Sequence, residues 1–353
     1  MTSAAATAVH PQAVRLRVPW LAAGIAAVLV ALVIGVMIGP VGIPAGSVIR
    51  ELLSHVPFLG VRSHLSAQNA AIITELRLPR VVLALLVGAM LSMAGASYQG
   101  VFRNPLADPY LLGAAAGAGL TVTLVIVLRS TVPEGDQLVP IAAFVGALGA
   151  VTFSYVIGRS TGGRSIVTLV LAGVAITSFL TAIQAYLLQQ NSDTLREVYT
   201  WILGRLTTAT WSDVLLVLPY FAVSTVVLMF HRRVLDVFAV GEQEASTLGI
   251  PVARTRLVIV IAASLATAAA VAVSGLIGFV GIIVPHAVRL VAGASYRVIL
   301  PLSILFGGAF LVFADLAGRT VISPSELPIG VITAFLGAPF FIIVLRTSLR
   351  GAR

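Results

Sequence analysis

The side chains that most often do chemistry are scarce in this chain. It has 353 residues, with 13 acidic residues, five histidines and no cysteine. No H-E-x-x-H zinc motif is present, because the residues that follow the five histidines are Pro11, Val56, Leu65, Arg232 and Ala287. The lack of cysteine excludes disulfides and thiolate metal sites. We therefore predict no catalytic residue and no metal site, and we interpret His286, beside Arg289, as structural.

The basic residues are all arginine. There are 22 of them and no lysine, which gives a net charge of +9. The phosphate-binding loop of an ATPase needs a lysine that reaches the β- and γ-phosphates. This chain cannot supply that loop, so ATP and Mg would have to be bound by a partner subunit, and we expect no cofactor in the chain itself. The arginines lie at the ends of apolar segments rather than on one face, which favours membrane orientation over nucleic-acid binding.

The elements that must position these residues are apolar helices. The composition is 59% hydrophobic and 10% charged, whereas a soluble domain carries about 25% charged residues. A bilayer-spanning helix needs roughly 20 apolar residues. We predict an all-α polytopic membrane protein, with a tail at 1–18, a transmembrane domain at 19–347 and a tail at 348–353. Its ten spans are expected near residues 20–38, 80–102, 113–128, 138–158, 167–189, 213–230, 257–273, 275–292, 299–317 and 328–346.

Ten spans place both termini on the same side of the membrane. If the N-terminus is cytoplasmic, fourteen of the 22 arginines lie inside and eight outside. This bias favours cytoplasmic termini under the positive-inside rule. The apolar run after Arg15 and Arg17 is too long for a signal-peptide core, so we expect it to remain as the first span.

Three segments between spans are not expected to cross the membrane. Residues 40–78 form a long outer loop, and residues 191–212 contain an interfacial helix. The cytoplasmic segment 231–256 contains a short helix between Gly241 and Pro251, with Glu242 and Glu244 in its first turn and Gly249 at its end. Such a helix suits a lever for a cytoplasmic partner; the alternative is an ordinary loop.

Two patterns within the spans predict what particular helix faces contact. Thr177, Thr181 and Gln184 follow at i, i+4 and i+7, so they share one face of the fifth span, where polar side chains face protein or water. The alternative is that the threonines bond to carbonyls of their own helix. On the eighth span, 275–292, glycines recur every three residues and predict close helix packing.

Several short motifs together resemble one family, the FecCD-type permeases, which are transmembrane subunits of importers for vitamin B12, haem and ferric siderophores. In chain order these motifs are Arg77-Leu-Pro-Arg80, Asn104-Pro-Leu-Ala-Asp-Pro109, Leu112-Gly113, Leu171-Ala-Gly-Val174, Gly241-Glu242, Leu248-Gly-Ile-Pro251, Gly278-Phe-Val-Gly281, Val284-Pro-His286, Glu326-Leu-Pro-Ile-Gly330 and Leu336-Gly-Ala-Pro339.

The resemblance implies an assembly as well as a fold. It implies the ten-helix fold of type II ABC importer permeases, paired with an identical or similar permease subunit in a bacterial inner membrane. Two cytoplasmic ATPase subunits and an extracytoplasmic substrate-binding protein complete such an importer. Segment 241–251 would then be the coupling helix, with Glu242 and Leu248 as contacts of the ATPase.

The resemblance also assigns roles to residues at the two membrane surfaces. Arg77, Arg80 and Arg319 are expected to dock acidic residues of the binding protein; the alternative is that they snorkel at span ends. The fifth span is expected to line the translocation pathway, which places Thr177, Thr181 and Gln184 there. The residues implied at the cytoplasmic gate are Ser165, Ile166 and Val167.

The cargo is the least determined property. Ferric siderophores are the commonest cargo in the family that the chain resembles, and haem and cobalamin are the alternatives. An ion-coupled secondary transporter would instead need ionisable residues buried in the middle of its spans. Only Asp315 comes close, near the outer end of the ninth span. We therefore expect a pump component rather than an ion-coupled carrier.

Overall fold

Helices make up nearly all of the structure. A computed structural model describes residues 16–56, 58, 60–128, 135–160, 166–323 and 325–350. Within this part of the chain there are no strands, which confirms the predicted all-α class. The α-helices are α1 (Val18–Met37), α2 (Ala45–Ser54), α3 (Ala67–Ala71), α4 (Leu78–Val101), α5 (Ala114–Leu128), α6 (Gly135–Ser160), α7 (Ile166–Gln190), α8 (Leu195–Ile202), α9 (Trp211–Val240), α10 (Glu242–Thr247), α11 (Val252–Ser274), α12 (Val280–Ala292), α13 (Tyr296–Thr320) and α14 (Ile329–Arg350).

Each of the ten predicted spans overlaps an apolar helix. Among the described residues, seven helical segments are long and apolar enough to cross a membrane, and three apolar helices are shorter. The short α8 lies within segment 191–212, where a helix is predicted, and its interfacial position stays a prediction. The predicted outer loop at 40–78 contains α2, α3 and a π-helical turn, Ile72–Arg77, that leads into α4. Helix α9 continues beyond its predicted end to Val240, so segment 231–256 contains two helix ends as well as α10.

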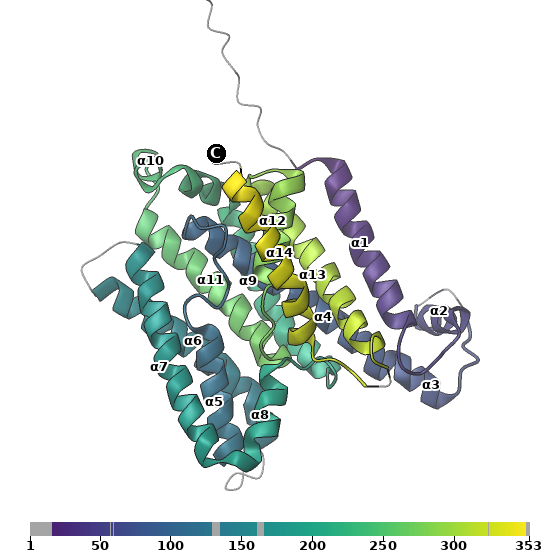
Figure 1. Cartoon of the computed structure of the whole chain (residues 1–353). Coiled ribbons are helices and arrows are strands. Elements are labelled where there is room, and N and C mark those ends of the chain that lie inside the picture. The colour runs from purple at the N-terminus through teal and green to yellow at the C-terminus, as the bar shows by residue number, and fades with distance from the viewer. Residues whose placement is uncertain are drawn as a thin grey trace, which may run out of the picture.

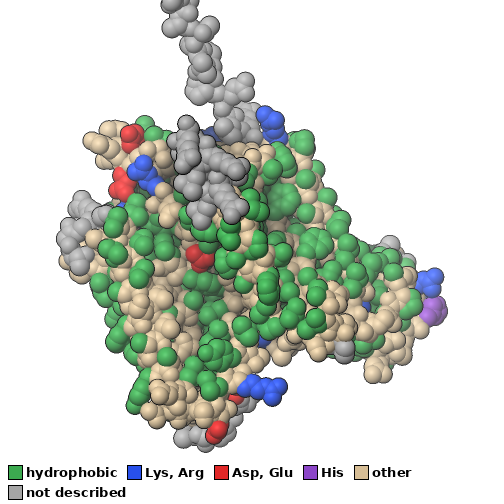
Figure 2. Space-filling model, viewed as in Figure 1, with side chains coloured by type: hydrophobic (Ala, Val, Ile, Leu, Met, Phe, Trp, Pro, Cys, Tyr) green, Lys and Arg blue, Asp and Glu red, His purple; other side chains and the backbone are tan. Residues whose placement is uncertain are grey.

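The bundle has two distinct ends (Figure 1). The start of α1, α10 and the end of α14 lie together at one end, named here the α10 end. The short α8 lies at the opposite end, named here the α8 end. Apolar side chains cover much of the face between them (Figure 2). Large apolar side chains are exposed on α1, α7 and α9, as expected of helices that face lipid or other subunits.

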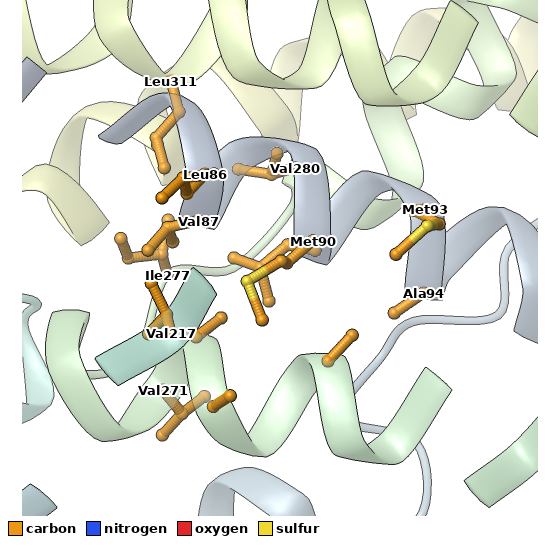
Figure 3. Close-up of a cluster of buried hydrophobic side chains, with 14 of the residues drawn as sticks. Leu86, Val87, Met90, Met93, Ala94, Val217, Val271, Ile277, Val280 and Leu311 are labelled. Carbon is orange, nitrogen blue, oxygen red and sulfur yellow. The ribbon is translucent and has the colours of Figure 1, made fainter. Parts of the chain in front are cut away.

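Helix α4 is the centre of the fold. It is buried along almost its whole length, with α9, α11, α12 and α13 packed around it. A helix that is apolar on all sides belongs in the middle of a bundle. Figure 3 shows Leu86, Val87 and Met90 of α4 gathered with apolar side chains from its neighbours, among them Val217, Val271 and Leu311.

Glycine pairs let the backbones of α4 and its neighbours approach closely. A Cβ atom placed on Gly88 would lie 2.2 Å from the carbonyl oxygen of Gly307 on α13. At Gly95 it would lie 2.0 Å from the carbonyl oxygen of Gly281 on α12. Small residues are the usual means of close helix packing in lipid, where apolar side chains alone give little driving force.

The eighth span differs from its prediction, because it is not helical from residue 275. Helix α12 begins only at Val280, and Gly275 adopts a φ of +70°, a left-handed conformation that ends α11. Gly281 packs on Gly95, which lies about 9 Å before the end of α4. The break at 275–279 therefore lies inside the bundle. Gly275, Gly278 and Gly281, which the sequence pattern places on one helix face, do not form such a face.

The crossing of α4 and α12 gives a stability prediction. Gly95→Ala should push the two helices apart and lower the free energy of unfolding by about 1 to 3 kcal/mol, the usual cost of overpacking. The matched control is Gly149→Ala on α6, where a Cβ meets no atom within 4 Å. Thermal unfolding of the purified proteins in detergent checks this, and equal melting temperatures for Gly95→Ala and the wild type would contradict it.

Candidate functional site

The segment between α9 and α11 forms a compact cap at the α10 end. Helix α10 spans Glu242–Thr247, close to the predicted segment 241–251. Gly249 follows it with a φ of +77°, and the amide of Ile250 donates to the carbonyl of Ala245 over 3.0 Å. This left-handed glycine ends the helix as predicted from the sequence, and Pro251 turns the chain into α11.

Two features hold α10 against the rest of the bundle. Glu242 forms an ion pair with Arg256 of α11, whose side chain is buried, and Ala245 packs inward with no exposed surface. Glu244 lies exposed beside Gly241. Leu248 points outward with 69% of its surface exposed. A short helix that is fixed in place and has an exposed apolar residue at its end offers a surface that a protein partner can bind.

The predicted gate residues lie where α7 begins. Ile166 is the first residue of α7 and is half-buried, and Val167 is 63% exposed. Ser165 lies outside the described residues. Both described side chains are apolar. Leu169, three residues further along α7, lines a pocket with Glu242 and Ser246, so α7 begins near the cap. Their assignment to a gate stays a prediction.

The polar stripe predicted for the pathway turns partly inward. Gln184 is buried and its amide nitrogen donates to the hydroxyl of Thr123 on α5 over 3.0 Å. Thr177 is half-buried against Gly113, where a Cβ would lie 3.3 Å from its hydroxyl. Gln184 pairs with α5 because a polar group in a bundle needs a partner, and its assignment to the pathway stays a prediction. Thr181 is exposed and keeps its predicted assignment.

The open face of α7 carries different residues from those predicted. It presents large side chains whose exposed fractions are 61% at Leu171, 54% at Val174, 62% at Phe179 and 60% at Tyr186. Their spacing of three, five and seven residues follows one broad side of the helix. The polar pattern of α7 does not predict this face, because the surface left open is mainly apolar.

The predicted docking arginines bind groups within the chain. The Arg77 guanidinium donates to the carbonyls of Val36 and Met37, each over 3.1 Å, and to that of Val41. Arg319 donates to the carbonyls of Gly35 and Ile38, each over 3.3 Å. Both arginines thus bond the last carbonyls of α1, which lack partners within the helix and carry its negative dipole end.

A charge cluster connects these arginines to two acids. Asp315 is 2% exposed and forms ion pairs with Arg80 over 2.8 Å and with Arg319 over 3.1 Å. Arg80 also pairs with Glu326 over 2.9 Å. The sequence analysis missed both acids as partners. The spacing of Asp315 and Arg319, i and i+4 on one helix, is a signal that could have revealed one pair.

This geometry corrects one premise of the docking prediction. Arg77 and Arg319 are 5% and 3% exposed, and Arg80 is held by two carboxylates. None of the three presents an unpaired guanidinium to the surface at the α8 end. Their role toward a binding protein stays a prediction. In this structure they fix the end of α1 to α4 and α13.

The cluster gives a second stability prediction. Asp315→Asn should leave Arg319 buried without its carboxylate and lower the free energy of unfolding by about 3 to 5 kcal/mol, the cost of breaking a buried pair. Glu326→Gln is the control, because the Glu326 side chain is 25% exposed and Arg80 keeps Asp315. Thermal unfolding measures both. Equal losses for the two variants would argue against Asp315 as the centre of the cluster.

Comparisons with known proteins agree with this architecture. Residues 27–347 match the FecCD transport family. The chain is 43% identical over 334 residues to YvrB, an uncharacterised ABC transporter permease protein of Bacillus subtilis, covering 94% of both chains. It is 45% identical over 275 residues to the cobalamin import system permease protein BtuC of Halobacterium salinarum, covering 78% of this chain and 73% of that protein. It is 38% identical over 276 residues to the hemin transport system permease protein HmuU of Yersinia pestis, covering 77% and 82%.

A solved structure shows the same fold. A metal-chelate type ABC transporter in an inward-facing conformation superposes with a TM-score of 0.80 at 26% identity, covering 93% of this chain and 98% of that chain. The helix arrangement and the sequence match therefore agree over nearly the whole chain. The chain belongs to the FecCD transport family and is a permease protein of the ABC transporter class.

Proposed function

We propose that this permease imports a metal chelate, with a ferric siderophore as the first candidate cargo and haem or cobalamin as alternatives. It would lie in a bacterial inner membrane with both termini and α10 in the cytoplasm. Relatives named for cobalamin, hemin, ferric citrate and iron-hydroxamate import support this class of cargo. ATP and Mg would be bound by two separate ATPase subunits, since the chain has no lysine for a phosphate-binding loop.

The observation that carries the proposal is the cap helix α10. It is held on α11 by the Glu242–Arg256 ion pair, and Leu248 beyond it is exposed. A partner that covered Leu248 would remove its apolar surface from water, and this burial would favour association. Groove docking of a short helix by its apolar side is a common mode of protein recognition. The ATPase subunit would supply that groove.

The pathway would form between two permease subunits. The apolar side of α7 and exposed residues of α14, such as Phe335 at 73%, are unpaired faces of one chain. A second copy or a similar subunit would cover them and leave a path lined in part by α7, with Thr181 exposed on it. Ile166 and Val167 would narrow the path at the α10 end, where apolar side chains close a pore by excluding water.

Docking of the binding protein would take place at the α8 end. If Arg77 and Arg319 receive its acidic side chains, those carboxylates must replace the α1 carbonyls that the arginines bind now. The exchange is chemically reasonable, because a carboxylate is a stronger acceptor for a guanidinium than a carbonyl. It would release the end of α1 when the binding protein arrives.

Transport itself tests the proposed cargo. Proteoliposomes containing the permease, its ATPase and its binding protein should accumulate a ferric siderophore when ATP is supplied, and should take up less haem and cobalamin at equal concentration. Vesicles with the ATPase but no ATP are the control. Uptake of haem or cobalamin instead would replace the siderophore as cargo, and uptake driven by a proton gradient without the ATPase would overturn the pump.

The ATPase contact has its own test. Leu248→Asp should abolish co-purification of the ATPase subunit, because a charge would replace the apolar contact at the tip of the cap. The control is Thr207→Asp, which adds the same charge at an exposed position near α8. Membrane insertion of both variants should be normal. Retention of the ATPase by Leu248→Asp would exclude α10 as its docking helix.

A further inference from the structure

Two cavities meet between α6 and α11. The first has a volume of about 290 Å³ and lies beside the cap helix, where Arg159, Glu242, Ser246 and Arg256 line it. The second has a volume of about 310 Å³ and is lined almost entirely by apolar residues of α6 and α11. Tyr155 belongs to the lining of both. The two cavities are therefore neighbours that adjoin at Tyr155, and together they are called the groove below, with a polar part and an apolar part.

The groove runs from the α10 end into the membrane. Its apolar part includes Leu148 and Val156 on α6, which ends at Ser160, and Leu257 and Leu265 on α11, which begins at Val252. At 1.5 Å per residue these side chains lie roughly 6 to 20 Å from the helix ends. Half of the hydrocarbon core is about 15 Å thick. The apolar part thus spans the depth of the acyl chains of one leaflet.

The polar part carries positive charge at the level of the headgroups. Arg256 is paired with Glu242, whereas Arg159 is exposed and has no ion pair among the described residues. The Ser246 hydroxyl is exposed beside them. An arginine fork matches the oxygens of a phosphate group. Tyr155 lies between the two parts, as tyrosines do at membrane interfaces.

The apolar part is open on its outer side. Val156 and Ile261, which line it from α6 and α11, are 58% and 56% exposed. Helices α6, α7 and α11 lie side by side in Figure 1, with α10 above them and α1 on the far side of the bundle. A ligand could therefore enter the groove sideways from the bilayer, with its polar end toward α10.

We infer that this groove binds one anionic phospholipid of the leaflet at the α10 end. The phosphate lies against Arg159, and one acyl chain lies along the apolar part between Val156 and Ile261. A basic pocket between transmembrane helices is the type of site that selects anionic headgroups. The bound lipid joins α6 to the cap helix and α11, so it stiffens the base of α10. The same site would serve a permease of any cargo.

Lipid titration of the full-length permease in detergent tests the site. Native mass spectrometry counts adducts with phosphatidylglycerol and with phosphatidylcholine of the same acyl chains. One phosphatidylglycerol should bind saturably and more tightly than phosphatidylcholine. Arg159→Gln should weaken phosphatidylglycerol binding about fivefold, the factor that one basic side chain contributes near an anionic headgroup. Arg159→Lys should keep most of the preference, because it keeps the charge.

Two further variants test the apolar part of the groove and control for the loss of an arginine elsewhere on the protein. Ile261→Trp should fill the groove and weaken binding of both lipids. Arg17→Gln, an exposed arginine at the start of α1, should bind phosphatidylglycerol like the wild type. Equal affinity of the wild type for the two lipids, or unchanged binding by Arg159→Gln, would overturn the inference. So would a change of oligomeric state in Ile261→Trp with unchanged lipid binding, because a neighbouring subunit would then occupy the groove.

Discussion

Backbone groups buried inside a protein must find hydrogen-bond partners within it, and several helices of this chain begin or end where other segments cover them. The backbone groups that are left without partners at one break form hydrogen bonds with groups at another. The amide of Arg205, after α8, donates to the carbonyl of Ser274 over 2.7 Å, and the amide of Gly330 donates to the carbonyl of Leu203 over 2.9 Å. The Tyr110 hydroxyl, before α5, bonds both the amide and the carbonyl of Ile277 over 3.1 Å. These bonds fix where α5, α12 and α14 begin, and the remaining helices pack around them.

The short motifs of the sequence are the contact points of these breaks. Phe279 adopts a φ of +69°, unusual for a residue with a side chain, and its ring fills the space at Gly337 on α14. A Cβ at Gly281 would lie 2.5 Å from Pro109. Segments 104–109, 278–281 and 336–339, which are far apart in the chain, therefore meet at one place. Strained backbone of this kind persists only where its surroundings determine it fully.

Local patterns predicted the helices well and their partners poorly. Runs of apolar residues located ten helices, and Gly249 with Pro251 located the end of α10, because such signals act within one or two turns. The start of α12 could not be found this way, since the chain around Gly275 is as apolar as a helix. Arg80 meets Asp315 and Glu326 more than 200 residues away. Likewise, the inward turn of Gln184 depends on Thr123 of another helix, and a one-helix pattern contains no information about that contact.

The same long-range packing explains how the cap and the breaks could act together. Helix α11 begins beside α10, contains no glycine or proline, and ends at Ser274, where the chain enters the break at 275–279. A straight helix without such residues bends little, because kinks occur mainly at proline, glycine and bulges. If a displacement of α10 moved α11 along its axis, Ile277 and Phe279 would therefore move by nearly the same distance. Those two residues contact Tyr110 before α5 and Gly337 on α14, so one rigid element connects the surface at the α10 end to the interior of the bundle.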